Sequence, residues 1–393
     1  MSIVIFGDNF SFPEGSAATG RVHTYAKGFR ENGVNVHVIC FSSEYSNNGN
    51  GIHNGINYYY PFEEKKRSSN IFIRNRRKLK KYFKTYHLLK KINKEDKVVA
   101  VSRWTNRLRT HLFAWMLSKM FGFKLIIEAS EHPLRLYQGK AWTRMVGSTK
   151  LYISSSLCDG ILCISRYLVD FYKSHGVSDK KLLLVPSTVD PYLLNQKYQR
   201  PVPGPYVGYF GSLTFKRDNV DMLIRAFALF SQIHPDVDLV LGGFFPENSE
   251  ERLMDLVMEL GLGVRVKVLD FLTRAEILTY ITNADILVMT RSKNLESDAS
   301  YPSKLTEFLA TGKPVISVKV GEISDFLTDK ENAFLVEPGD VRGLSEKLEF
   351  VHDNYEYALH VSQKGKKLTE EVFNYNYQAK RIIDFIDILY KKK

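Results

Sequence analysis

The stretch Tyr301-Pro-Ser-Lys-Leu-Thr-Glu-Phe-Leu-Ala-Thr-Gly-Lys-Pro-Val-Ile316 decides how this chain of 393 residues is interpreted. It predicts a loop that ends at Pro302, then a short helix, and then a buried strand that opens at Pro314. Ser303 is expected at the N-cap position of the helix. Gly312 is expected to end the helix in a left-handed conformation.

The start of this helix also predicts a binding site. A helix N-terminus that carries a lysine, here Lys304, attracts anions because its free N–H groups point outward. Glu307, one turn deeper, can accept two hydroxyl groups of a sugar ring. Phosphate at the helix start and ribose at the carboxylate describe a nucleoside diphosphate site, with Ser303, Lys304, Leu305 and Glu307 as its expected residues.

Outward from this stretch, strand-like and helix-like segments alternate along the whole chain. The expected strands are 3–6, 36–40, 98–101, 124–128, 160–164, 182–185, 206–210, 239–241, 266–269, 286–289, 315–318 and 333–336. The expected helices include 20–32, 103–121, 168–175, 220–233, 250–260 and 274–283. Short β-rich runs that alternate with amphipathic helices predict parallel α/β sheets covered on both faces.

A cluster of prolines between Pro186 and Pro205 interrupts this pattern. Because 393 residues are too many for one core, the chain is predicted to form two doubly wound, Rossmann-like domains. The boundary is expected near residue 195, which gives domains 1–195 and 196–373. In such folds ligands bind beyond the carboxyl ends of the strands, here in the cleft between the domains.

Composition favours a cytoplasmic protein. Cys40, Cys158 and Cys163 lie in or beside apolar runs, as expected of buried thiols in a reducing compartment. No apolar run reaches the about 18–20 residues of a membrane span. The N-terminus enters a strand-like run directly, and no secretion signal is expected there.

Positive charge is concentrated in the first half of the chain. Residues 1–200 carry 32 Lys and Arg against 14 Asp and Glu, whereas the remaining residues carry 23 against 29. The excess is densest in residues 65–91, where cations alternate with aliphatic and aromatic residues. An anionic membrane surface attracts such a segment, and we expect this partner rather than nucleic acid. A solvated helix whose apolar side packs on its own domain is the alternative.

Six segments of the chain, taken in order, resemble one known family. They are Pro13–Arg21, Cys158–Ser165, Leu184–Asp190, Val207–Leu213, Ala284–Val288 and Tyr301–Ile316. Together they resemble the family-4 glycosyltransferases, which are retaining enzymes of the GT-B fold, over nearly the whole chain. The resemblance also implies that the tail 374–393 crosses back onto the first domain.

The resemblance implies transfer of a hexose-type sugar from a UDP- or GDP-linked donor to a glycan or lipid-linked glycan. Assembly of cell-surface polysaccharide or glycoconjugates on the inner face of the cell membrane is the expected setting. A GT-B nucleotide-sugar epimerase and a non-catalytic basic adaptor that binds nucleotide are the alternatives. The sequence gives no oligomeric state.

The loop after the first strand is expected to approach the donor phosphate. Gly15 and Gly20 are five positions apart and lack the Gly-x-Gly-x-x-Gly spacing, which argues against a dinucleotide site. In the resembling enzymes the equivalent loop brings backbone N–H groups to the phosphate. Gly15 and Ser16 suit that role because small residues let the backbone come close to a ligand.

A second phosphate element is expected after Gly211. The family typically has an arginine directly after this glycine and a lysine five residues later. Here Ser212 replaces the arginine, and Arg217 takes the lysine position with Lys216 beside it. Arg217 and Lys304 are expected to balance the charge that grows on the leaving diphosphate. Neither a metal ion nor a cofactor is therefore expected.

The family commonly has a further glutamate eight positions before the residue that matches Glu307. In this chain that position is Ala299. Glu296 and Asp298 are close to it, and Arg291 or Asn294 could contact the transferred sugar instead. The identity of the sugar stays open.

The acceptor side is expected in the first domain, at Ala129-Ser-Glu-His-Pro133. This segment resembles the family loop that faces the anomeric centre, so Glu131 or His132 could orient the acceptor hydroxyl. The leaving phosphate is thought to help deprotonate the acceptor in retaining members, and His132 would then position rather than attack. The expected catalytic residues are His132, Glu131 and Arg217. Phe271 and Leu272, after strand 266–269, are expected to border the base pocket.

Overall fold

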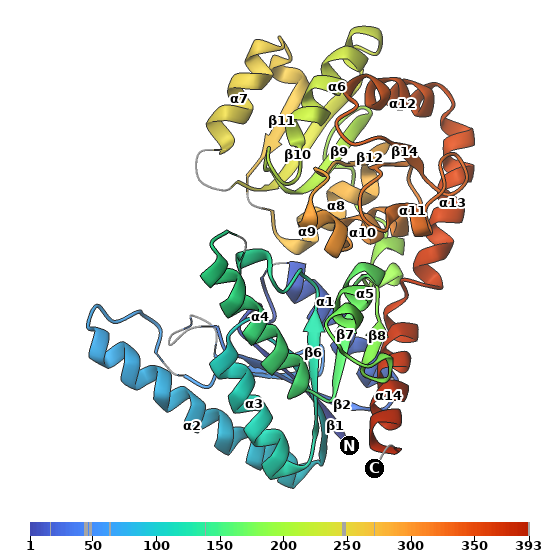
Figure 1. Cartoon of the computed structure of the whole chain (residues 1–393). Helices are drawn as coiled ribbons and strands as arrows, with labels where there is room; N and C mark the ends of the chain where they lie inside the picture. Colours follow the sequence, from blue (N-terminus) through green and yellow to red (C-terminus); the bar gives the residue numbers. More distant parts are fainter. Residues whose placement is uncertain are drawn as a thin grey trace. The chain divides into compact units, whose positions relative to one another are not determined.

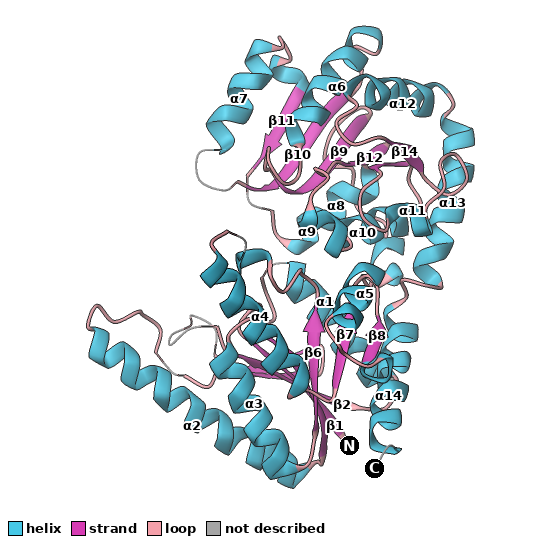
Figure 2. Ribbon diagram, in the orientation of Figure 1, coloured by secondary structure: helices cyan, strands magenta, loops and turns pink. Residues whose placement is uncertain are grey.

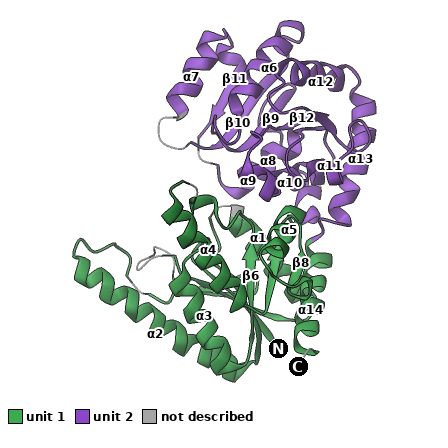
Figure 3. Ribbon diagram, viewed as in Figure 1, with its two compact units in different colours: residues 1–188, 375–393 green, residues 189–374 purple. Residues whose placement is uncertain are grey.

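The computed structural model describes residues 1–15, 17–42, 46, 49–62, 64–137, 139–245, 249–270 and 272–391. They form two compact units, which are coloured separately in Figure 3. Unit 1 comprises Met1–Thr188 and Tyr375–Lys393, and unit 2 comprises Val189–Asn374. Each unit is a doubly wound α/β sheet, which confirms the predicted fold class.

Unit 1 contains a sheet with the strand order β3-β4-β2-β1-β5-β6-β7-β8. Neighbouring strands are parallel except for the antiparallel pair of β3 and β4. The strands are β1 (Ser2–Gly7), β2 (Asn35–Cys40), β3 (Gly51–His53), β4 (Ile56–Tyr59), β5 (Val98–Trp104), β6 (Lys124–Ala129), β7 (Gly160–Cys163) and β8 (Leu182–Leu184). The helices are α1 (Ala17–Glu31), α2 (Ile71–Glu95), α3 (Leu108–Phe121), α4 (Ala141–Ser156), α5 (Arg166–Ser174) and α14 (Tyr375–Lys391) (Figure 1).

Unit 2 contains a parallel sheet with the strand order β11-β10-β9-β12-β13-β14 (Figure 2). The strands are β9 (Tyr206–Ser212), β10 (Asp238–Phe244), β11 (Val266–Leu269), β12 (Ile286–Met289), β13 (Val315–Val318) and β14 (Phe334–Val336). The helices are α6 (Val220–Ile233), α7 (Ser249–Glu259), α8 (Arg274–Asn283), α9 (Leu295–Ala299), α10 (Ser303–Thr311), α11 (Ile323–Phe326), α12 (Val341–Asp353) and α13 (Tyr355–Glu370).

The central strand of unit 1 shows why the sheet is covered on both faces. Successive side chains of a strand point to opposite faces. Ile3 and Ile5 of β1 join a core with α1 and α14, whereas Val4 and Phe6 join a second core with α2 and α3. β1 is therefore apolar at nearly every position and belongs at the centre of the sheet.

The C-terminal helix α14 is part of unit 1 although it is the last segment of the chain. Its apolar stripe of Ala379, Ile382, Phe385, Ile386 and Leu389 packs into the core that β1 and α1 share. α1 and α14 cross closely, since a Cβ atom on Gly28 would lie 2.5 Å from the Cβ atom of Ala379.

Each sheet reverses its winding direction once. In unit 1 the chain moves outward from β1 to β2 and later returns to place β5 on the other side of β1. In unit 2 it moves from β9 through β10 to β11 and returns to place β12 beside β9. Ligands of doubly wound sheets bind at such switch points, beyond the carboxyl ends of the strands.

Some element boundaries differ from the sequence predictions. Pro302 is the N-cap residue of α10, and Ser303 is its first helical residue, so the N-cap assignment of Ser303 was wrong. The helix predicted over 103–121 begins only at Leu108, because β5 continues to Trp104. The short strands β3 and β4 were not predicted. Gly312, with φ of 72°, ends α10 in the left-handed conformation as expected.

Candidate functional site

The switch point of unit 2 has a buried cation at its centre. The ammonium group of Lys304, in the first turn of α10, lies 3.3 Å from a carboxylate oxygen of Asp218 and donates to the hydroxyl of Tyr209. Burial lowers the pKa of Lys304 to about 8, and Asp218 acts against this shift. Among the described residues no side chain caps the N-terminus of α10, so its dipole and Lys304 act on the same space.

Asp218 is held on the loop between β9 and α6. Its carboxylate accepts a hydrogen bond of 2.7 Å from Thr214, and its carbonyl oxygen accepts one of 2.7 Å from Thr290 after β12. Burial opposes ionisation of Asp218, but Lys304 and Thr214 outweigh it, so its pKa is lowered. The carboxylate is therefore ionised at neutral pH and keeps Lys304 at the strand ends.

Two arginines lie close to this pair. Arg291 follows β12, is buried, and donates to the Ser300 hydroxyl at 2.9 Å. Burial lowers the pKa of Arg291, and the positive charge of Arg217 lowers it further. Arg217 is exposed and also acts on Lys304 and Asp218, whereas Lys216 beside it is exposed as well. The structure thus brings Lys304, Arg291 and Arg217 together.

Glycines give this edge of the sheet its close backbone approach. Gly211 and Gly243 are paired neighbours at the ends of β9 and β10, with φ of 152° and 145°. A Cβ atom on Gly211 would lie 3.0 Å from the Lys304 nitrogen, and one on Gly243 would lie 1.8 Å from the Gly211 carbonyl oxygen. These positions therefore require glycine, which lets the two strand ends and the Lys304 side chain pack closely.

Glu307 is not alone on α10. Its two carboxylate oxygens lie 2.9 Å and 2.8 Å from the guanidinium nitrogens of Arg274, the first residue of α8. This bidentate pair fixes the carboxylate one turn below Lys304. A ribose at Glu307 would share or replace the contact with Arg274, a residue that the sequence did not single out.

Other predicted donor residues have distinct positions. Leu305 is fully buried and its backbone N–H donates to the Pro302 carbonyl, so it offers neither side chain nor N–H group to a ligand. Leu272 covers the end of β10, where a Cβ atom on Gly242 would lie 2.8 Å from its side chain. Phe271 lies outside the described residues.

The region before α10 explains the missing glutamate. Ala299 is fully buried, in the short helix α9. The Asn294 side chain accepts hydrogen bonds from the N–H groups of Glu296 and Ser297, so it caps α9 instead of facing open space. Of the residues weighed for sugar contact, Arg291 is the one that lies with the cations of the switch point.

In unit 1, the loop after β1 packs back onto the first turn of α1. Thr19 donates to the Ser11 carbonyl at 2.8 Å, and a Cβ atom on Gly15 would lie 2.4 Å from the hydroxyl oxygens of both residues. Gly15 itself is exposed. Ser16 lies outside the described residues.

A buried ion pair lies behind this loop. The Arg21 guanidinium donates to Glu128 at 2.7 Å and to the carbonyl oxygens of Val185 and Pro186 at 2.8 Å and 2.9 Å. Both side chains are almost completely buried. Arg21 thus connects α1 with the ends of β6 and β8, and its contacts are those of a structural residue.

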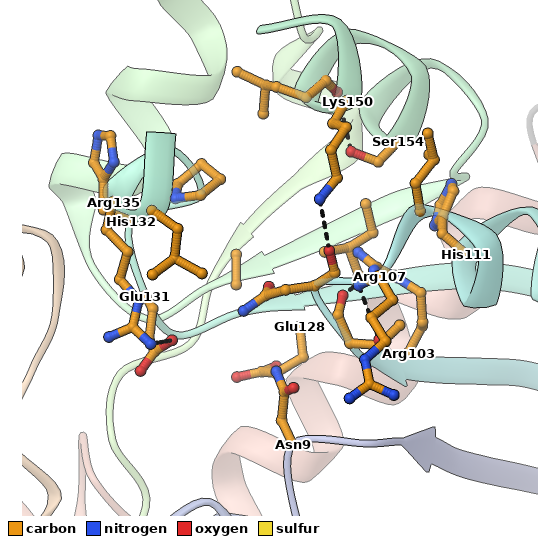
Figure 4. A pocket seen from close by; sticks show the side chains of 18 of the residues that line it. Asn9, Arg103, Arg107, His111, Glu128, Glu131, His132, Arg135, Lys150 and Ser154 are labelled. Carbon is orange, nitrogen blue, oxygen red and sulfur yellow. Dashed lines mark hydrogen bonds and ion pairs between the residues drawn. The ribbon is translucent and has the colours of Figure 1, made fainter. Parts of the chain in front are cut away.

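A pocket of about 390 Å³ lies at the carboxyl ends of β1, β5 and β6 in unit 1. Figure 4 shows Glu131, His132 and Arg135 on one side, and Arg103, His111 and Lys150 on the other. Arg135 belongs to the 3-10 helix η1 (Arg135–Tyr137), and Lys150 belongs to α4. The pocket contains the switch point between β1 and β5.

His132 has one defined tautomer in this pocket. Its Nδ1 atom accepts a hydrogen bond of 3.2 Å from the N–H of Leu134, so the ring proton is on Nε2. Burial, and then His175, lower the pKa of His132, which is therefore neutral at pH 7. A neutral ring of this tautomer donates from Nε2 and does not accept a proton there. Glu131 is half exposed and lies 3.1 Å from Arg135.

The basic segment forms helix α2, and its exposed face mixes apolar and charged side chains. Phe72, Leu79 and Phe83 are 81%, 72% and 66% exposed, and at helical spacing they share a face with Arg76 and Lys80. Lys81 is buried on the opposite face. Its ammonium group donates to the Phe41 carbonyl at 3.2 Å, so counting Lys81 with the surface cations was wrong. No helix in the described ranges has both the length and the apolarity that a membrane span needs.

Residues 193–368 match the family described as Glycosyl transferases group 1. The chain is similar to sucrose-phosphate synthase from Thermosynechococcus elongatus, with 18% identity, a TM-score of 0.73 and 100% coverage of both chains. It is also similar to Anabaena HepE in complex with UDP and glucose, with 16% identity, a TM-score of 0.71 and coverage of 98% and 99%.

A third similar structure is S. aureus TarM, with 10% identity, a TM-score of 0.72 and coverage of 98% of this chain and 100% of that chain. No curated protein matches the chain. At these identities the solved structures show the fold, which is GT-B, and they match it over the full length. The resemblance found in six sequence segments is confirmed, and the match to the Glycosyl transferases group 1 family covers residues 193–368 of the chain.

Proposed function

We propose that the chain transfers a hexose-type sugar, with retention of configuration, from a UDP- or GDP-linked donor to a glycan or lipid-linked glycan. The observation that carries this proposal is the cation cluster of Lys304, Arg291 and Arg217 at the unit 2 switch point. These residues lie within the part of the chain that matches the family. HepE was solved with UDP and glucose, which supports a nucleotide sugar as donor.

The proposed donor chemistry is stabilisation of a leaving diphosphate. Negative charge grows on the phosphate as the glycosidic bond breaks, and fixed cations that need no rearrangement lower the barrier. Lys304, Arg217 and the N-terminus of α10 would provide that field. Lys304 remains mostly protonated at pH 7, since its pKa is about 8. Glu307 would bind the ribose hydroxyls one turn deeper.

On the acceptor side, His132 and Glu131 are proposed to orient the attacking hydroxyl. The Nε2–H group of His132 donates, so His132 holds the acceptor oxygen but does not take its proton. The proton would go to the leaving phosphate as the new glycosidic bond forms. This division of roles fits a retaining transferase that uses no protein nucleophile.

We also propose that the enzyme works on the cytoplasmic face of an anionic membrane, in the assembly of cell-surface polysaccharide or glycoconjugates. α2 carries ten Lys and Arg against one Glu. Exposed Phe72, Leu79 and Phe83 between cations suit insertion at a headgroup layer, with about 1 kcal/mol per well-placed cation. The charge of this face is complementary to anionic lipid.

A nucleotide panel tests the donor proposal. UDP, GDP and ADP are compared by thermal shift, because a ligand of the folded state raises the melting temperature. The matching nucleotide sugars are then incubated with acceptor extract and followed for free diphosphate and for an epimerised sugar. Diphosphate release that needs acceptor supports the transferase, an epimerised sugar supports the epimerase, and nucleotide binding without turnover supports the adaptor.

Vesicle sedimentation tests the membrane proposal. Phe72, Leu79 and Phe83 are changed to Ser in one variant, and Arg76 and Lys80 to Gln in another. Both should reduce binding to anionic vesicles and keep UDP or GDP binding, with salt weakening the parent protein's association. Gln at Lys119 and Lys180, two exposed lysines outside α2, is the charge-matched control. Equal binding by all variants, or none by the parent at low salt, would contradict the proposal.

A further inference from the structure

The pocket of unit 1 contains more positive than negative charge once its ion pairs are counted. Its lining residues include the acidic residues Asp8, Glu128 and Glu131, and the side chain of Glu128 is fully buried. Each is paired with an arginine, at 3.2 Å to Arg107, 2.7 Å to Arg21 and 3.1 Å to Arg135. The lining residues Arg103 and Lys150 have no carboxylate at ion-pair distance among the described residues.

Arg103 is a buried cation whose hydrogen-bonding groups are only partly satisfied. It is 6% exposed, at the end of β5, and one terminal nitrogen donates to the Thr105 carbonyl. Its Nε atom is buried without a hydrogen-bond partner in the described part of the chain. Burial lowers the pKa of Arg103, and Asp8 opposes this shift only from beyond ion-pair distance, so no ion pair offsets the desolvation of the guanidinium. The fold places this cation at the pocket with no carboxylate at ion-pair distance in the described part of the chain.

His111 lies beside Arg103 and is similarly unsatisfied. It is fully buried on α3, and neither ring nitrogen has a hydrogen-bond partner among the described residues. Burial and the charge of Arg103 lower the pKa of His111 to about 3, so the ring is neutral. A neutral ring can donate one hydrogen bond and accept another without adding charge.

Lys150 completes the cationic side of the pocket. Its ammonium group donates to the Asn106 carbonyl at 3.1 Å and to the Tyr137 hydroxyl. These partners are uncharged, so the positive charge of Lys150 is not neutralised. Arg103 and Lys150 come from β5 and α4, and both face the space that Glu131 and His132 border (Figure 4).

We propose that this pocket binds an anionic group of the acceptor, a phosphate or a carboxylate, through Arg103 and Lys150 with His111 as an uncharged hydrogen-bond partner. The inference rests on the proposed transferase function and names the acceptor class as a negatively charged glycan or lipid-linked glycan. Planar guanidinium groups suit both phosphate and carboxylate oxygens. The anion would hold the acceptor while His132 and Glu131, across the pocket, meet its hydroxyl.

The test measures binding of small anions to the full chain. Pyrophosphate, phosphate, D-glucuronate and uncharged glucose are titrated by calorimetry in saturating UDP, which blocks the donor site of unit 2. If UDP does not bind, the Lys304→Ala variant replaces it. Arg103→Gln and Lys150→Gln are compared with Arg109→Gln, which removes an exposed arginine of α3 outside the pocket.

Binding of an anion but not of glucose, weakened at least tenfold by Arg103→Gln and spared by Arg109→Gln, is the expected result. Phosphate or pyrophosphate without glucuronate identifies a phosphorylated acceptor, and glucuronate alone identifies an acidic sugar. Lys150→Gln gives the same comparison should Arg103→Gln fail to fold. No anion binding by the parent protein, or anion binding by both pocket variants that equals that of the parent, overturns the inference. Anion binding without any sugar transfer would instead contradict the proposed function alone.

Discussion

The two switch points occupy equivalent places in their sheets but are built differently. In unit 2, glycines at the ends of β9 and β10 let backbone come close, and the buried cation Lys304 retains a carboxylate partner in Asp218. In unit 1, the carboxylates of the pocket are paired with arginines, and Arg103 faces the pocket with no carboxylate at ion-pair distance in the described ranges. The same topology thus supports a backbone-lined site in one unit and a side-chain pocket in the other.

The ion pairs Arg21–Glu128 and Lys304–Asp218 also differ in how far their contacts leave the cation available. Arg21 uses its guanidinium nitrogens on Glu128 and two carbonyl oxygens, and the pair is closed to ligands. Lys304 makes one ion pair and one hydroxyl contact, and its side chain is 17% exposed. We infer that the first pair stabilises unit 1, whereas the second keeps a cation available for phosphate.

The largest expected effect comes from breaking the Arg21–Glu128 ion pair. Glu128→Gln leaves Arg21 charged and buried without a counter-ion, which should lower the free energy of unfolding of unit 1 by about 3–5 kcal/mol. Urea unfolding is followed by tryptophan fluorescence, because Trp104, Trp115 and Trp142 all lie in unit 1. UDP binding at unit 2 should survive in the variant below its unfolding transition.

The matched control for this experiment removes both charges. Arg21→Met combined with Glu128→Leu should recover much of the lost stability, since no buried charge is left unpaired. If Glu128→Gln were as stable as the parent protein, the pair would not hold unit 1 together. The proposed difference in role between the Arg21–Glu128 pair and the Lys304–Asp218 pair would then be wrong.

Removing Lys304 should weaken nucleotide binding, beside the loss of stability that follows from leaving the buried Asp218 carboxylate unpaired. Lys304→Ala removes a charged contact to the diphosphate, and Glu307→Ala removes contacts to the ribose. Each should weaken nucleotide binding by about 1.5–3 kcal/mol, since hydrogen bonds to charged groups are worth that much. Calorimetry measures this, with Lys364→Ala at an exposed lysine of α13 as the control. Unchanged affinity in both variants would remove the donor site from α10.

Several elements of unit 2 were predicted correctly from the sequence. The strands β11, β12 and β13 and the helices α6 and α8 have their predicted boundaries, because each is a short apolar or amphipathic run. Thr273, for example, caps α8 with Glu276 in a capping box. Local signals of this kind are readable without knowledge of the fold.

Boundaries failed where tertiary contacts decide. Residues 103 and 104 continue β5, because Arg103 and Trp104 are buried at the strand end despite following a polar Ser102. α2 was predicted as a basic segment, with a helix whose apolar side packs on its own domain as the alternative. The burial of Lys81 had a sequence signal, since it shares a helical face with Thr85, Leu89 and Ile92.

The candidate site was predictable only in part, for a similar reason. Lys304 and Glu307 lie on one capped helix, so their spacing was visible in the sequence. Their partners Asp218 and Arg274 come from other elements, 86 and 33 residues away. Arg103 and His111 carried no signal at all, because the pocket exists only after β1, β5, β6 and α4 meet.

A change of pH should have a smaller effect, on the nucleotide affinity of the unit 2 site. Lys304 has a pKa of about 8 in the free protein, so it loses its proton as the pH rises from 7 to 9. Nucleotide affinity should then fall, by up to about tenfold per pH unit above that pKa. Lys304→Arg, which stays charged, should give a flat profile over the same range in calorimetry.

The free energy of unfolding should change with pH in the opposite direction to the nucleotide affinity. The folded pKa of Lys304 is below its ordinary value of 10.5, so between pH 8 and 10.5 the unfolded chain binds more protons. The contribution of Lys304 to the free energy of unfolding therefore rises with pH in that window and is least favourable below it. Nucleotide affinity that is constant from pH 7 to 9 would show that Lys304 does not meet the phosphate.

The smallest expected effect is that of metal removal, for which no loss of turnover is predicted. At the unit 2 switch point Lys304, Arg291, Arg217 and the α10 N-terminus already provide positive charge for the diphosphate. In the described part of the chain, His234, His352 and Asp353 form a group that could hold a metal ion. His234 is at the C-terminal end of α6, and His352 and Asp353 are at that of α12. A helix that follows a parallel strand runs back along it, so this group lies at the opposite end of the sheet from Lys304.

Sugar transfer is measured with EDTA and after Mg²⁺ or Mn²⁺ is returned. Activity that EDTA abolishes and either ion restores would mean that the cations of unit 2 do not suffice, and that this switch point also needs a metal to hold the diphosphate.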